Sequence, residues 1–189
     1  VMAPKSCLFT VDKATGLLEP ARFCESPNQD DRPDAREPTL LVIHGISLPP
    51  GQFGGREVEE LFTNALDWDA HPFFGEIRGL EVSSHLLIRR DGELVQFVPF
   101  TKRAWHAGES SFRGRERCND HAIGIELEGT DTDSFEENKY RSLAELISSL
   151  RQAYPDIGDH ITGHCDIAPG RKTDPGTGFD WSKLHSMLA

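Results

Sequence analysis

Two of the eight histidines stand where an apolar stretch of the chain gives way to a loop rich in glycine and proline. His44 closes the apolar segment 39–44, and His164 lies in the short segment 161–165. Asp174 follows in the loop after His164, where prolines and glycines restrict the backbone. Two imidazoles and one carboxylate suit a catalytic Zn²⁺ that keeps one position open for water. These three residues are therefore predicted to form a zinc site, with structural histidines beside a surface loop as the alternative.

Glu126 lies within the apolar stretch 122–127, where a carboxylate is unfavourable unless it is paired or functional. In a strand, alternation would place Ile125 and Glu126 on opposite faces. A Glu126 facing the metal could act as general base towards a zinc-bound water. A solvent-facing strand edge is an equally good interpretation. Lys172, which lies close to Asp174 in the same loop, could stabilise a developing oxyanion, although loop lysines are commonly just solvated.

The segment 102–117 is basic and aromatic, with five basic residues against two acidic ones in a chain whose net charge is −11. An aromatic ring beside arginines suits a ligand that has a sugar ring and carboxylates. We therefore expect Trp105, His106 and Arg117 to bind substrate. The other arginines of the segment are better interpreted as solvated.

The elements that position these residues follow from hydrophobic periodicity and turn chemistry. Apolar runs predict buried strands at 39–44, 122–127 and 161–165, and turn pairs predict hairpins around Asp91-Gly92 and Thr15-Gly16. Helical spacing predicts three helices. The first lies near 56–67, the second begins at a capping box formed by Ser134 and Glu137 and ends at Pro155, and the third runs from about Asp180 to the C-terminus. The expected fold class is α/β: a single domain with a central mixed β-sheet flanked by α-helices.

The chain of 189 residues, 37% of them hydrophobic, suits one domain with a buried core. We expect a catalytic domain at 38–189, with an N-terminal hairpin and polar loop at 1–37 packed on it. The negative charge argues against nucleic acid and anionic membranes as partners. No apolar run suits a membrane span or a secretory signal, and the four cysteines lack Cys-x-x-Cys spacing. Reduced thiols and a cytoplasmic location are therefore expected.

Five motifs follow one another along the chain: 44–51, 84–92, 103–108, 124–129 and 163–176. Together, from about Pro38 to Trp181, they resemble the zinc-dependent N-acetylmuramoyl-L-alanine amidases. The similarity is greatest to the cytoplasmic branch of that family, which acts on anhydro-muropeptides in cell-wall recycling.

The resemblance implies the fold shared with peptidoglycan recognition proteins, a Zn²⁺ cofactor and an anhydro-muropeptide substrate. It implies that His44, His164 and Asp174 bind the zinc and that Glu126 and Lys172 are the catalytic pair. The reaction would be hydrolysis of the amide between the lactyl group of anhydro-N-acetylmuramic acid and L-alanine.

Two positions depart from the pattern of the family. Ser84 stands where more distant relatives have a catalytic tyrosine, and Gly45 stands where close relatives usually have asparagine. The second departure puts a hydrogen bond to substrate in question. Three other interpretations remain: an exported amidase acting on intact peptidoglycan, a non-catalytic peptidoglycan-binding module, and a metal-free structural domain.

Overall fold

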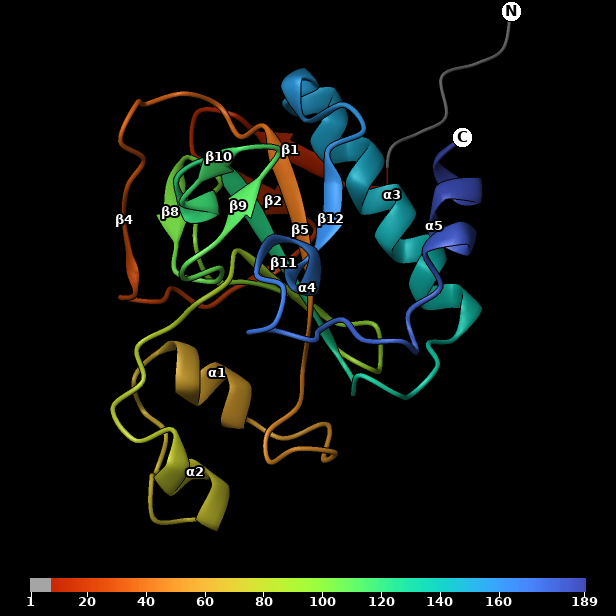
Figure 1. Ribbon diagram of the computed structural model, residues 1–189. Helices are drawn as coiled ribbons and strands as arrows, with labels where there is room; N and C mark the ends of the chain where they lie inside the picture. The colour runs from red at the N-terminus through yellow and green to blue at the C-terminus, as the bar shows by residue number, and fades with distance from the viewer. Residues whose placement is uncertain (1–7) are drawn as a thin grey trace, which may run out of the picture.

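A six-stranded mixed sheet forms the centre of the protein, whose computed structural model describes residues 8–189 (Figure 1). The strand order is β12-β5-β11-β6-β7-β3. The four strands from β12 to β6 run parallel to one another, β7 is antiparallel to β6, and β3 is parallel to β7. Their bounds are β3 Arg22–Phe23, β5 Leu40–Ile46, β6 Leu86–Ile88, β7 Leu94–Gln96, β11 Ala122–Glu128 and β12 Ile161–Gly163.

Three small antiparallel pairs lie outside this sheet. They join β1 (Thr10–Asp12) to β2 (Leu17–Glu19), β4 (Gln29–Asp31) to β8 (Lys102–Ala104), and β9 (Ser111–Phe112) to β10 (Arg115–Glu116). The pairing of β1 with β2 confirms the N-terminal hairpin. Phe9 and Leu18 are buried in the main hydrophobic core, so this hairpin packs against the rest of the chain.

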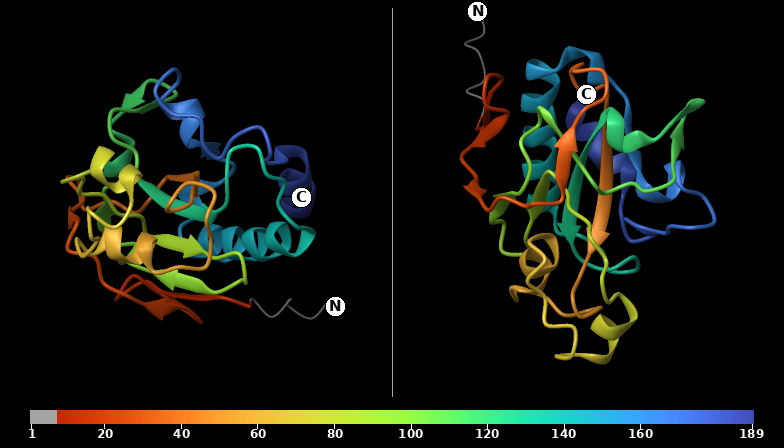
Figure 2. Two further views of the ribbon diagram at one scale, coloured as in Figure 1. Left: turned by 90° about the horizontal axis from the view of Figure 1, so that it is seen from below. Right: turned by 90° about the vertical axis from the view of Figure 1, so that its left-hand side faces the viewer.

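Five α-helices and two 3₁₀ turns complete the described part of the chain: α1 Glu57–Phe62, α2 Pro72–Glu76, α3 Glu137–Ala153, α4 His164–Ile167, α5 Trp181–Leu188, η1 Cys118–Asp120 and η2 Pro155–Ile157. The long helix α3 and helix α5 cover one side of the sheet, whereas α1 and α2 lie together at one end of the molecule (Figures 1 and 2). Within residues 8–189, no helix combines the length and the apolar character needed to cross a membrane.

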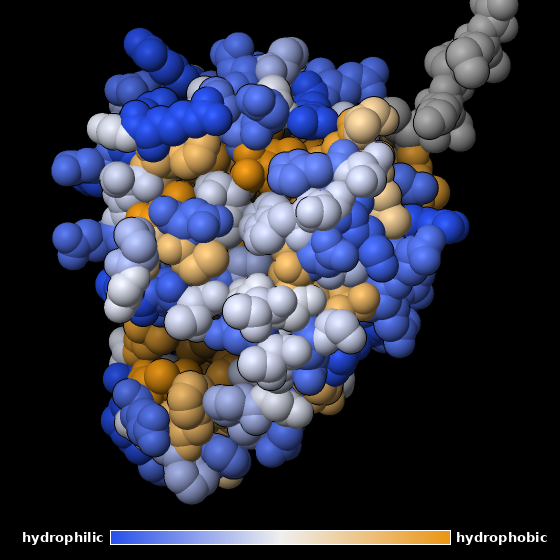
Figure 3. Space-filling model, turned by 45° about the vertical axis from the view of Figure 1, so that its right-hand side comes forward, coloured by the Kyte–Doolittle hydropathy of each residue, from blue (hydrophilic) through white to orange (hydrophobic). Residues whose placement is uncertain are grey.

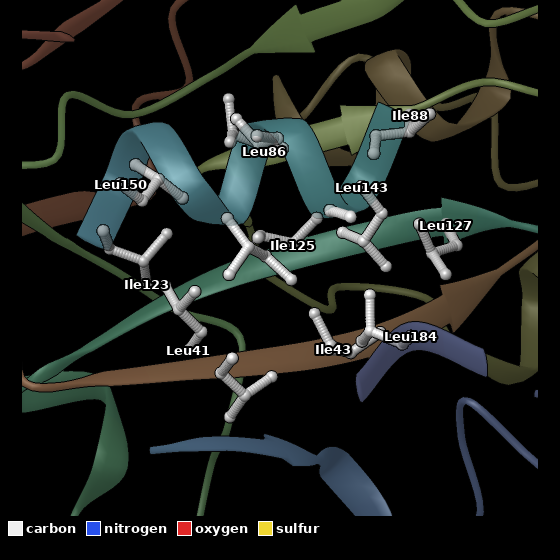
Figure 4. Packing of buried hydrophobic residues seen from close by; sticks show 14 of the residues in the cluster. Leu41, Ile43, Leu86, Ile88, Ile123, Ile125, Leu127, Leu143, Leu150 and Leu184 are labelled. Atoms are coloured by element: carbon white, nitrogen blue, oxygen red, sulfur yellow. The ribbon is translucent and has the colours of Figure 1, made fainter. Parts of the chain in front are cut away.

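Strand alternation divides the residues of β5 and β11 between the two faces of the sheet. The face towards α3 carries Leu41 and Ile43 from β5 and Ile123 and Ile125 from β11, packed beneath Leu143 of the helix (Figure 4). Full burial of each such side chain contributes about 1.5–3 kcal/mol. The opposite face of these two strands is therefore left for other side chains, and the functional groups lie there.

The fold class is confirmed, and the differences from expectation are local. Strand β5 continues to Ile46, past His44, and His164 begins α4 instead of ending a strand. The helix expected near 56–67 is confined to α1 (Glu57–Phe62), and helix α2 was missed because five residues are too few to show a helical period.

The expected capping box before α3 is wrong. The helix begins at Glu137 after Glu136, and no side chain caps it. The chain before it is held differently, because Asp131 accepts a backbone hydrogen bond from Gly178 at 2.9 Å. The loop at 130–135 thus packs against the loop that carries Asp174. At the other end, helix α3 stops before Pro155, as expected.

Candidate metal centre and active site

The strands β5 and β11 bring His44 and Glu126 together. The two residues are register partners in the parallel pair, and both side chains point to the face away from α3. His44 is 1% exposed and Glu126 is 8% exposed. The interpretation of Glu126 as a solvent-facing edge residue is therefore wrong, because β11 is an interior strand of the sheet.

His164 and Asp174 reach the same point from the segment that follows β12. His164 is the first residue of α4, and the amide of Cys165 donates to the carbonyl of Asp174 at 2.9 Å. The loop after α4 is held at its start as well, since the amide of Lys172 donates to Ala168 at 3.0 Å. This backbone pairing returns the loop to the helix and places the Asp174 carboxylate beside both histidines.

Three ligand atoms converge at this point. His44 Nδ1 lies 3.0 Å from His164 Nδ1 and 3.3 Å from Asp174 Oδ2, and His164 Nδ1 lies 3.1 Å from Asp174 Oδ1. With zinc bonds of about 2.0–2.2 Å, tetrahedral angles place two ligand atoms about 3.3–3.6 Å apart. Among the His, Cys, Asp and Glu residues of the described chain, His44, His164 and Asp174 form a group whose spacing suits a metal ion.

The other ring nitrogen of each histidine also has a partner. His164 Nε2 lies 3.2 Å from the carbonyl oxygen of Ala107, which can only accept a hydrogen bond. A neutral His164 therefore carries its proton on Nε2 and directs the lone pair of Nδ1 towards Asp174. His44 Nε2 lies 2.9 Å from His106 Nδ1. The lone pairs of a neutral imidazole and of a carboxylate repel each other when they point to the same place. A cation bound between them removes this repulsion, so this set of donor atoms fits Zn²⁺.

Burial and neighbouring side chains control the protonation of the ligands. Burial lowers the pKa of His44 to about 4, so the imidazole is neutral at physiological pH, as metal binding requires. Burial acts in the opposite direction on Asp174, but the side chains of His164 and His44 beside it hold the pKa of that carboxyl well below its ordinary value. Asp174 therefore supplies the negative charge of the cluster.

Glu126 stands beside the ligands without a strong partner of its own. Its Oε1 lies 3.9 Å from His44 Nδ1, and its buried Oε2 has no hydrogen-bond partner within the described chain. Burial raises the pKa of Glu126 well above its ordinary value, Asp174 adds to the rise, and the positive charge of Lys172 opposes it. A carboxylate with a free oxygen and a raised pKa can exchange a proton with a nearby reactant.

A cavity of about 530 Å³ opens onto these groups. Its lining includes the three ligands, Glu126 and Lys172, and an apolar wall that comes from α1, α2 and the segments that flank them. The apolar wall includes Leu48, Leu61, Phe62, Phe73, Ile77, Leu80 and Val82. Figure 3 shows a hollow with apolar walls near the end of the molecule that carries these two helices.

The structure brings Trp105 and His106 to the cavity but not Arg117. Trp105 lines the cavity, and its buried indole Nε1 has no partner in the described chain. His106 also lines it, but its Nδ1 faces His44. Arg117 lines a neighbouring hollow instead, which meets the main cavity at Arg171.

The basic segment 102–117 is largely neutralised by acidic residues. Lys102 contacts Asp31, and Arg103 contacts both Asp30 and Asp120. Arg117 lies 3.4 Å from Asp120. The charge count of the segment therefore overstates its positive field. The acidic partners come from β4, which is distant in sequence, and from η1, so a count over 102–117 alone does not include them.

Sequence reasoning missed Ala107, Asn119 and Arg171. Ala107 acts through its backbone carbonyl, to which Arg171 also donates at 2.6 Å. Asn119 Oδ1 accepts from the amides of His106 and Ala107. An alanine and an asparagine in a polar loop carry no signal of such roles. Arg171 could have been suspected from its place next to Lys172.

The chain belongs to the N-acetylmuramoyl-L-alanine amidase family, whose profile matches residues 34–177. It is 59% identical over 174 residues to the 1,6-anhydro-N-acetylmuramyl-L-alanine amidase AmpD of Salmonella typhimurium, covering 92% of this chain and 93% of that protein. A crystal structure of a selenomethionine derivative of AmpD superposes with a TM-score of 0.91 at 55% identity, covering 95% of this chain and 99% of that one.

A more distant structure carries a ligand. It is the Escherichia coli N-acetylmuramyl-L-alanine amidase AmiD in complex with its substrate anhydro-N-acetylmuramic acid-L-Ala-D-gamma-Glu-L-Lys. The TM-score is 0.58 and the identity is 27%, covering 95% of this chain and 65% of AmiD. The expected family and fold are thereby confirmed.

Proposed function

We propose that the chain is a zinc-dependent amidase that hydrolyses the amide between the lactyl group of 1,6-anhydro-N-acetylmuramic acid and the L-alanine of muropeptides. The observation that carries the proposal is the convergence of His44, His164 and Asp174 beside Glu126 in one cavity. The high identity to AmpD over most of both chains supports the choice of substrate.

When bound, zinc supplies Lewis acidity and lowers the pKa of a coordinated water from 15.7 to about 7. His44 and His164 would hold the ion through imidazole nitrogens, and Asp174 would contribute the negative charge. Glu126 takes the proton of the attacking water on a carboxylate oxygen. It then delivers that proton to the alanine nitrogen, so that the amide bond breaks to give a carboxylate and a free amine.

Lys172 and Trp105 have supporting roles in the proposal. Lys172 lines the cavity and stabilises the negative charge that develops on the carbonyl oxygen. Trp105 binds the sugar ring and offers its unpartnered Nε1–H. Arg117 binds a carboxylate of the stem peptide, which must then extend past Arg171 into the neighbouring hollow. His106 lines the same cavity, and its Nδ1 lies against His44 Nε2.

Product analysis tests the proposal. Purified protein is incubated with an anhydro-muropeptide, with intact sacculi, and with a soluble muropeptide that has a reducing sugar, each with and without a chelator. Mass spectrometry should find free anhydro-N-acetylmuramic acid and free peptide, and the chelator should abolish both. Faster release from sacculi would favour an exported amidase, and zinc binding without hydrolysis would favour a binding module.

The proposal places the reaction in the cytoplasm. Cys24, Cys118 and Cys165 are free in the described part of the chain, and thiols persist in a reducing compartment. Fractionation of cells that produce the protein at native level, followed by detection with an antibody, tests this location. Recovery with periplasmic markers would contradict it.

A further inference from the structure

One side-chain oxygen holds two successive backbone amides beside the metal cluster. Asn119 Oδ1 accepts from the amide of His106 at 3.0 Å and from the amide of Ala107 at 2.8 Å. Asn119 lies in the turn η1 and is only 7% exposed. A buried acceptor with two donors fixes both the position and the orientation of the dipeptide that it binds.

The two residues of this dipeptide contact different histidine ligands. The carbonyl oxygen of Ala107 lies 3.2 Å from His164 Nε2, and the ring nitrogen Nδ1 of His106 lies 2.9 Å from His44 Nε2. Each contact occupies the nitrogen that faces away from the cluster. Both histidines can therefore present Nδ1 to the metal only while His106 and Ala107 stay in place.

The contact between His106 and His44 has further support from the sheet. The two rings are nearly perpendicular, at 87°, with centroids 5.0 Å apart. A Cβ at Gly124 would lie 2.5 Å from Cγ of His106, so the ring occupies space that only a glycine in β11 leaves open. The hydrogen bond that the backbone amide of His106 donates to Asn119 and the space left by Gly124 together determine where the His106 ring lies.

We propose that Asn119 is a positioning residue of the metal centre, which fixes His106 and Ala107 and thereby orients both histidine ligands through their outer nitrogens. Partners of this kind set the tautomer and direction of metal-binding histidines, and their loss lowers metal affinity about 10–100-fold. Arg171 also donates to the carbonyl oxygens of Ala107 and Glu109, but within the described residues no hydrogen bond joins it to His106. The role of Asn119 is therefore distinct, because it reaches both ligands.

The experiment measures zinc affinity by competition with a chromophoric chelator, not by activity. Asn119→Leu removes the acceptor but keeps the branched shape of the side chain, Asn119→Asp keeps an oxygen in place, and Gln96→Leu is the matched control. Gln96 is a buried carboxamide that accepts from the amide of Leu18, away from the cluster. We expect at least ~10-fold weaker binding for Asn119→Leu and binding within about threefold of the native protein for the other two variants.

The inference rests on the proposed zinc site, and the outcomes separate the two. A native protein without zinc affinity would overturn the site itself. Tight native binding with equally tight binding by Asn119→Leu would overturn the role of Asn119 alone. The role would also be rejected if Asn119→Asp bound zinc as weakly as Asn119→Leu, or if Gln96→Leu lost as much affinity.

A second measurement needs no variant and tests the two contacts through which Asn119 is proposed to act. In zinc-loaded native protein labelled with ¹⁵N, the hydrogen bond from His44 Nε2 to His106 Nδ1 should give a nitrogen–nitrogen scalar coupling across it. The spectrum should also report a proton on Nε2 of both ligands. A proton on Nδ1 of either His44 or His164 would overturn the inference.

Discussion

Glu126 and His44 are paired residues of two adjacent parallel strands, and Glu126 Oε1 lies 3.9 Å from His44 Nδ1. The candidate general base is therefore set beside a candidate ligand by the register of the sheet. Because both residues lie inside hydrogen-bonded strands, their separation does not depend on a mobile loop. His164, Asp174 and Lys172, by contrast, reach the site from the segment after β12.

Replacement of Glu126 by glutamine should abolish most turnover while leaving zinc bound. Glutamine is nearly isosteric but cannot accept a proton, and general base catalysis contributes about 10²–10⁴-fold to rate. The measurements are kcat on an anhydro-muropeptide and zinc content after gel filtration. Glu145→Gln, on the exposed side of α3, is the control and should behave like the native protein. Activity of Glu126→Gln close to native would exclude the proposed role.

The positions of His44 and Glu126 could be predicted because each interrupts an apolar strand pattern, and strands of period two fix the face on which a residue lies. The loop context predicted His164 and Asp174 as ligands but left structural histidines as an alternative, and the resemblance to a family implied the ligand set. Their pairing depends on α4 and on the hydrogen bond from Cys165 to Asp174, which no local pattern indicates.

The positioning of the ligands could not be predicted, because it depends on groups without a sequence signature. The carbonyl of Ala107 is a backbone atom that any residue has, and the room for His106 comes from Gly124, 18 positions along the chain. Likewise the charge of Arg103 was counted without its partner Asp30, which arrives from a separate strand.

His85 should make the metal-free protein less stable as the pH falls. Burial, followed by the positive charge of Arg32, lowers the pKa of His85 to about 3 from the ordinary 6.5. Between these values the unfolded chain binds a proton that the folded chain does not, so stability is present above about pH 6.5 and is lost as pH falls, by up to about 1.4 kcal/mol per unit.

The variant His85→Gln can still accept from Gly124 and donate to Lys102 but does not titrate. Urea unfolding in the presence of a chelator, from about pH 7 to about pH 4.5, should therefore show a shallower loss for His85→Gln than for the native protein. Identical slopes would contradict the assignment of this pH dependence to His85.

Gly178 should not tolerate alanine, because a Cβ there would lie 2.1 Å from the carbonyl oxygen of Asp133. The clash falls on backbone and must shift the loop that carries Asp174. We expect Gly178→Ala to lose roughly 1–3 kcal/mol of unfolding free energy and to bind zinc more weakly.

Gly75 in α2 is the matched control for Gly178, since a Cβ there would meet no atom within 4 Å. Gly75→Ala should be neutral or more stable by up to about 1 kcal/mol. Thermal unfolding and chelator competition on both variants decide the matter. If the two variants were equally stable, the loops that carry Gly178 and Asp133 would be able to move apart without loss of unfolding free energy.

Gly45 should accept asparagine, the residue that the resemblance to the amidase family implies at this place. A Cβ at Gly45 would lie 3.6 Å from Pro175 Cα and 3.9 Å from Asp174 Cβ, which are ordinary contacts. Gly45 also lines the cavity, so a carboxamide there can donate or accept one more hydrogen bond to substrate. One such bond contributes about 1 kcal/mol, so KM for an anhydro-muropeptide should fall about fivefold in Gly45→Asn. Gly45→Ala, which adds the Cβ alone, should leave KM and zinc affinity at native values. A KM for Gly45→Asn equal to that of Gly45→Ala would mean that substrate makes no bond to this position.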